Sequence, residues 1–91
     1  MELGGNIFLE NFDEVESGKL IVVKKVVGNY TKNISEKAKN FKKITINLKK
    51  SSAFEIEAKV EADKEISSIA KEDNLFFALD KALSEILDKA A

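Results

Sequence analysis

The clearest pattern in the chain is an apolar residue at every third or fourth position between Leu20 and Phe41. Such spacing places side chains on one face of an α-helix. The stripe consists of Leu20, Val23, Val27, Tyr30, Ile34, Ala38 and Phe41. It predicts an amphipathic helix that has Ser17 as its N-cap and ends at Asn40, with an earlier start at Asp13 left open.

Gly28 and Asn29 interrupt this helical pattern near its middle. Glycine inside a helix costs about 1 kcal/mol relative to alanine. We therefore expect the pair to mark a kink or a place where another segment approaches closely.

Alternating apolar and polar residues predict four strands, at residues 6–12, 43–49, 54–62 and 65–71. Alternation directs every second side chain to the same face of a sheet. The inward side of the second and third strands is apolar and consists of Ile44, Ile46, Leu48, Phe54, Ile56, Ala58 and Val60. The outward acids Glu55, Glu57 and Glu61 are expected to lie across from lysines of the preceding strand.

A second amphipathic helix is predicted at the end of the chain, capped by Asp73 or Asn74. Its expected buried stripe is Leu75, Phe76, Leu79, Ala82, Leu83, Ile86 and Leu87. Phe77 falls outside this stripe. We expect it to pack at the edge of the domain, and the alternative is a stacking or partner contact.

The predicted order of elements is β-α-β-β-β-α, in one domain spanning residues 1–91. Both helices must lie on one face of a four-stranded sheet if their apolar stripes are to be buried together. The expected class is therefore α+β, with the other face of the sheet left polar.

Charge is distributed unevenly along the chain. Residues 17–52 hold ten lysines and one acid, although the whole protein has a formal net charge of −1. Lys25, Lys32 and Lys39 follow each other at intervals of seven, opposite the apolar stripe, and span roughly 21 Å of helix. A solvated helix face is the structural alternative, but such faces usually mix both signs. We therefore predict a basic surface for RNA.

The predicted RNA-binding set extends beyond those three lysines. It also contains Lys24, Lys43, Lys49 and Lys50. Residues 49–52 are expected to form a flexible basic turn that contacts phosphate, and an ordinary hairpin tip is the alternative. Because the chain has no arginine, phosphate binding must come from lysine point charges.

Composition argues against catalysis. The chain contains no cysteine and no histidine, and it has no nucleophile elbow, phosphate-binding glycine loop or zinc-ligand spacing. An acid-base pair among Asp73, Asp80 and Asp88 is the remaining enzymatic alternative, but their spacing fits caps and a solvated face better. We expect no enzyme activity, no cofactor and no metal. No apolar run approaches the roughly 20 residues of a membrane span, so we expect no membrane partner and a cytoplasmic location.

One segment resembles a known family. The stretch from Asn74 to Asp80, N-L-F-F-A-L-D, follows Glu72-Asp73 and is similar to the D-M-Y-A-A-I-D segment that opens the last helix of ribosome hibernation-promoting factors and ribosome-associated inhibitors. The resemblance implies a fold like the double-stranded-RNA-binding domain and binding to the small ribosomal subunit through basic residues of both helices. In that comparison, Lys25, Lys32 and Lys39 correspond to the basic positions of the first helix.

The last helix departs from the family pattern. Where relatives have a basic-rich turn, this chain has Ser84, Glu85, Leu87 and Asp88, and only Lys81 and Lys89 remain as cations. Our main hypothesis is thus a module for the small ribosomal subunit or another structured RNA that binds weakly through the first helix and the basic turn. The alternative is a protein-interaction or homodimerisation domain that pairs through a sheet edge or Phe77.

Overall fold

The computed structural model describes residues 3, 6–50 and 53–90, except for the side chain of Lys50. Its elements follow the predicted order: β1 (Ile7–Glu10), α1 (Ser17–Lys37), β2 (Lys43–Lys50), β3 (Phe54–Glu61), β4 (Ile66–Glu72) and α2 (Leu75–Lys89). The predicted α+β class is confirmed.

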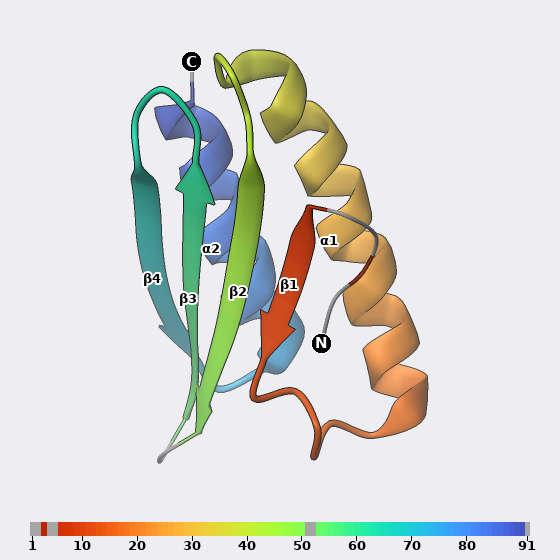
Figure 1. Cartoon of the computed structure of the whole chain (residues 1–91). Coiled ribbons are helices and arrows are strands. Elements are labelled where there is room, and N and C mark those ends of the chain that lie inside the picture. Colours follow the sequence, from red (N-terminus) through yellow and green to blue (C-terminus); the bar gives the residue numbers. More distant parts are fainter. Residues whose placement is uncertain (1–2, 4–5, 51–52, 91) are drawn as a thin grey trace.

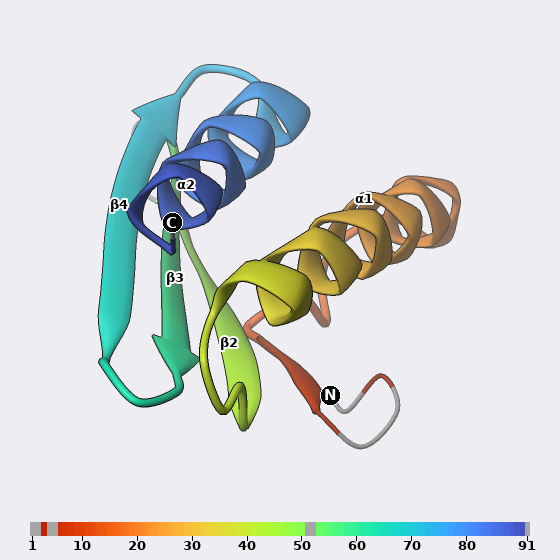
Figure 2. The same cartoon turned by 90° about the horizontal axis from the view of Figure 1, so that it is seen from above.

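The four strands form one sheet in the order β1-β2-β3-β4. β1 pairs with β2 in parallel, and the other two pairings are antiparallel. Both helices lie on the same face of this sheet, as predicted, and they begin at the same end of the molecule (Figure 1, Figure 2). The molecule therefore has two sides, one formed by the helices and one formed by the outer face of the sheet.

The core lies between the sheet and the helices. The inward residues of β2 and β3 meet Val23, Val27 and Ile34 of α1 and a broader set from α2. The fully or nearly buried α2 residues are Leu75, Ala78, Leu79, Ala82, Leu83 and Ile86. Ala78 is an addition to the predicted stripe, while Phe76 and Leu87 are only partly buried.

β1 is shorter than predicted, because it ends at Glu10 and not at Phe12. Asn11 takes a left-handed backbone conformation with φ of 64°, which breaks the extended chain. Phe12 is nevertheless 1% exposed, so it contributes to the core from the connection after the strand.

The start of α1 also differs from the prediction. Ser17 is the first helical residue, and Glu16 occupies the N-cap position without a side-chain hydrogen bond to the helix. The backbone carbonyl of Glu16 accepts from the N–H of Leu20 at 2.8 Å. The N-cap is thus one residue earlier than predicted, and the predicted cap by the Ser17 hydroxyl is wrong.

The predicted end of α1 at Asn40 is wrong. The helix ends at Lys37, and Ala38 has extended backbone with ψ of 125°. The turn that follows is tied to the turn after β3, because Asp63 N–H donates to the carbonyl of Lys39 at 3.0 Å and Asn40 Nδ2 donates to Asp63 Oδ1 at 2.7 Å. These contacts hold the chain in a turn where continued apolar spacing suggested helix.

Gly28 lies inside an unbroken helix. A methyl group built on it would meet nothing within 4 Å. The predicted close approach at this position is therefore wrong.

Candidate nucleic-acid interface

The outward side of α1 carries three of the predicted lysines. Lys24, Lys25 and Lys32 are all exposed, while Val23, Val27 and Ile34 face the core. Among the described residues, no ion pair involves a lysine of α1. These ammonium groups are presented to solvent without a competing carboxylate partner, as contacts to an external anion require.

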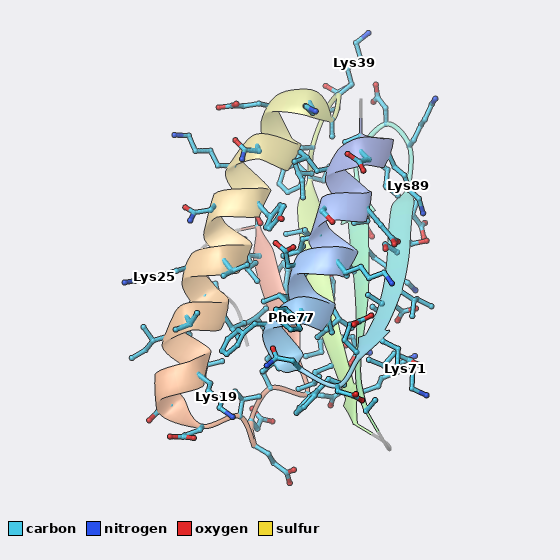
Figure 3. All side chains as sticks on the ribbon, turned by 180° about the vertical axis from the view of Figure 1, so that it is seen from behind. Lys19, Lys25, Lys39, Lys71, Phe77 and Lys89 are labelled. Carbon is cyan, nitrogen blue, oxygen red and sulfur yellow. The ribbon has the colours of Figure 1, made fainter. Side chains whose placement is uncertain are left out.

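Lys39 does not continue the line of Lys25 and Lys32, because it follows the end of the helix. It lies in the turn that contacts Asp63, at the end of the molecule where both helices finish (Figure 3). In this turn, Lys39 lines a hollow of about 370 Å³. Three further lysines line the same hollow: Lys37, Lys64 and Lys89.

Two of the four lysines around this hollow have a structural explanation. Lys37 and Lys89 occupy the last turns of α1 and α2, where cations interact favourably with the negative end of the helix dipole. Lys89 Nζ also donates to the backbone carbonyl of Ser67 at 2.8 Å. These contacts account for Lys37 and Lys89 but not for Lys39 or Lys64, which are exposed and form no ion pair among the described residues. The role of Lys39 in RNA binding stays a prediction, at a place separate from Lys25 and Lys32.

Lys43 and Lys49 lie on the outer face of the sheet, because they alternate along β2 with Ile44, Ile46 and Leu48, which face the core. Lys43 Nζ lies 3.9 Å from Glu61 Oε1, and Lys49 Nζ lies 3.9 Å from a carboxylate oxygen of both Glu55 and Glu57. The predicted cross-strand pairing of acids and lysines is confirmed. Lys43 Nζ also lies 5.6 Å from the centre of the Phe8 ring, so the ammonium group forms a cation–π interaction with that ring.

The expected basic turn is only partly described. Lys49 and Lys50 belong to β2, and Ser51 and Ser52 lie outside the described residues, as does the Lys50 side chain. The predicted set of cations is thus divided between the helical side and the sheet side of the molecule.

A hydrogen bond joins the two helices. The hydroxyl of Tyr30 on α1 donates to Oδ1 of Asp80 on α2 at 2.6 Å. This bond to the carboxylate, together with burial, raises the pKa of Tyr30 to about 12. The pair shows which sides of α1 and α2 face each other.

Phe77 lies in the first turn of α2 and is 67% exposed. The backbone N–H of Phe77 donates to Asn74 Oδ1 at 3.2 Å as part of the helix cap. Its side chain is on the helical side of the molecule, with Lys19 and Lys25 in the same view (Figure 3). The expectation that Phe77 packs at the domain edge is therefore wrong.

Lys19 is a candidate that the seven-residue spacing did not reveal. It precedes Tyr30 by eleven residues, about three helical turns, so both side chains leave α1 on the same side. Since Tyr30 contacts Asp80, Lys19 also faces α2. The spacing to Tyr30 is the signal in the sequence that could have identified it.

The part of the chain described by the structure offers no cluster of three or more acidic, cysteine or histidine side chains able to hold a metal ion. Neither α1 nor α2 has the length and apolar character to cross a membrane. What the helical side does present is exposed lysines of α1 without ion pairs among the described residues, and the exposed phenyl group of Phe77.

Comparison with known proteins finds structures but no sequence family. No protein-family model and no curated protein match the chain. The N-terminal domain of Protein Y from Thermus thermophilus aligns with a TM-score of 0.68 and 12% identity over 99% of this chain and 96% of that one. A ribosomal subunit interface protein from Coxiella burnetii aligns with a TM-score of 0.66 and 12% identity, over 93% and 92% of the two chains. The fold that the family resemblance implied is confirmed.

Proposed function

We propose that this chain is a cytoplasmic, non-enzymatic RNA-binding module that associates with the ribosome, most directly with its small subunit. The proposal rests on the solved fold neighbours, since one is a ribosomal subunit interface protein and both cover nearly the whole chain. The residues that would make the contact are those of the helical side.

The observation that supports RNA binding most strongly is the row of unpaired lysines on α1. Lys24, Lys25 and Lys32 are exposed, and no described carboxylate forms an ion pair with them. Lysines that contact phosphates release counterions from RNA, which favours association at low salt. A lysine that has no ion-pair partner loses no existing ion pair when it contacts a phosphate.

The other predicted cations should contribute less. Lys43 and Lys49 are paired with glutamates and lie on the opposite side of the sheet. On α2, Lys81 lies 3.5 Å from Glu72. Binding would therefore depend on a few lysines of α1, and we expect it to be modest in affinity and strongly dependent on salt.

Co-sedimentation with purified small ribosomal subunits tests the proposed function. The chain should pellet with the subunits at low salt and be released as salt is raised, because the contacts are electrostatic. Large subunits provide the comparison for specificity. If the chain stays in the supernatant with small subunits at low salt, the proposed function is wrong.

A second candidate is self-association through β4, one of the two edge strands of the sheet. Its residue Ile69 is 57% exposed on the outer face, and an exposed edge strand can pair with another copy. Sedimentation velocity across a range of protein concentrations distinguishes this candidate. A dimer that is disrupted by Ile69→Lys would support it, and a monomer at every concentration would exclude it.

A further inference from the structure

Phe77 is an exposed aromatic residue that the fold does not require. The neighbouring Phe76 packs against the core, whereas the Phe77 side chain is 67% exposed. Phe77 is not among the residues that pack against the core. Exposed aromatic groups of this kind often form binding sites.

The surroundings of Phe77 favour a nucleic acid over a protein as its partner. On α1, which also belongs to the helical side, Val22 is 44% exposed and lies three residues from both Lys19 and Lys25. Residues three apart on a helix are surface neighbours, so apolar and cationic groups alternate there. Protein interfaces are depleted of lysine, whereas surfaces that bind single-stranded nucleic acid combine aromatic groups with cations.

The charges nearest to Phe77 suggest where the phosphate would lie. On α2, Asp73 and Asp80 flank Phe77, and Asp80 accepts from the Tyr30 hydroxyl. Lys81, four residues after Phe77, is paired with Glu72 at 3.5 Å, so α2 offers no unpaired cation beside Phe77 among the described residues. Lys19 is on the α2-facing side of the first turn of α1, at the same end of the helix pair as Phe77 (Figure 3). It lines a hollow with the acids Glu14, Glu16 and Asp73 but forms no ion pair with a described residue.

We propose that Phe77 stacks on an unpaired RNA base while Lys19 contacts a phosphate next to that base. This inference rests on the proposed RNA binding and adds the kind of RNA that is recognised. A base inside a duplex has both faces covered by its neighbours, so the phenyl group can reach only a base in a loop, a bulge or a single strand. The chain should therefore prefer RNA with unpaired bases.

Tryptophan fluorescence gives a direct test, because the chain contains no tryptophan. Phe77→Trp introduces one reporter at the proposed site, and Ile69→Trp introduces a matched reporter on the outer face of the sheet, where Ile69 is 57% exposed. The probes are an RNA hairpin with a loop of unpaired adenines and a fully paired duplex of the same length. Stacking should quench the fluorescence of Phe77→Trp with the hairpin and leave Ile69→Trp unchanged.

Affinities measured with the same two RNAs complete the test. Phe77→Ala should weaken hairpin binding by about tenfold and leave duplex binding unchanged. If the hairpin binds in a salt-dependent manner but neither quenching nor this loss occurs, stacking is wrong and the proposed function still holds. If the wild-type chain binds neither RNA nor ribosomal subunits, both proposals fail. A change of Phe77→Trp fluorescence with protein concentration alone would assign Phe77 to a contact between copies and overturn stacking.

Discussion

Tyr30 and Asp80 are 50 positions apart in the chain, and their side chains form a 2.6 Å hydrogen bond that joins the two helices. Tyr30 donates from α1, and Asp80 accepts on α2. The bond links the sides of α1 and α2 that face each other, and Lys19 leaves α1 on the same side as Tyr30. Because Tyr30 is the only tyrosine of the chain, its titration reports on this contact without interference.

The phenol of Tyr30 should ionise at unusually high pH. Its pKa is raised from 10.0 to about 12, mainly by the hydrogen bond to Asp80. A raised pKa means that the hydrogen bond stabilises the folded protein fully below pH 10, the ordinary value, and that this contribution disappears as pH rises through about 12. Alkaline absorbance titration measures the midpoint, and circular dichroism at the same pH checks that the protein is folded.

Asp80→Ala is the matched variant for this titration. Without the carboxylate, the midpoint should return toward the ordinary value of 10.0. A wild-type protein that already titrates at the ordinary value while folded would show that the hydrogen bond does not form.

Gly28→Ala should stabilise the protein. Gly28 is inside α1, and an added methyl group would meet nothing within 4 Å. Alanine in a helix interior is favoured over glycine by about 0.5 to 1 kcal/mol. Thermal unfolding should therefore show a melting temperature higher by about 2 to 8 °C. A lower melting temperature would indicate that α1 needs the glycine for a contact that the structure does not contain.

Asn74 should cap α2, and Asp73 should not. Asn74 Oδ1 accepts from the backbone N–H of Phe76 at 2.8 Å and of Phe77 at 3.2 Å. Asn74→Ala should lower the free energy of unfolding by about 1 kcal/mol, measured by urea denaturation. Asp73→Ala, the control, should change it by less than about 0.5 kcal/mol. Equal losses in the two variants would contradict this assignment of the cap.

The fold was predictable because only one arrangement of the predicted helices and strands buries all of their apolar faces. The inward faces of the strands and the stripes of the two helices could be buried together only with both helices on one side of the sheet. The end of α1 was not predictable in this way. Ala38 and Phe41 continue the apolar spacing and contact the core, but they do so from a turn that is held by Asp63 and Asn40.

The candidate interface was less predictable than the fold. The sequence pattern shows that the lysines of α1 and of β2 point away from the core. The fold shows that the α1 lysines point to the helical side of the molecule and the β2 lysines to the opposite side, the outer face of the sheet. Lys25 and Lys43 therefore belong to one charged stretch of the sequence, but in the fold they lie on opposite sides of the molecule. The contact of Tyr30 with Asp80 depends on how the helices are placed and could not be derived from either helix alone. The spacing shows that Lys19 and Tyr30 share one side of α1, but only the structure shows that this side faces α2.

The central claim is that RNA binds through the lysines of α1. The most direct test compares two variants that each lose three positive charges, Lys24→Ala/Lys25→Ala/Lys32→Ala on α1 and Lys43→Ala/Lys49→Ala/Lys59→Ala on the outer face of the sheet. The measurement is the affinity of each for a small-subunit RNA fragment across a salt series. The slope of log affinity against log salt should become shallower by about 2 to 3 for the α1 variant and stay unchanged for the sheet variant. Equal slopes for the α1 variant and the wild-type protein would contradict the claim.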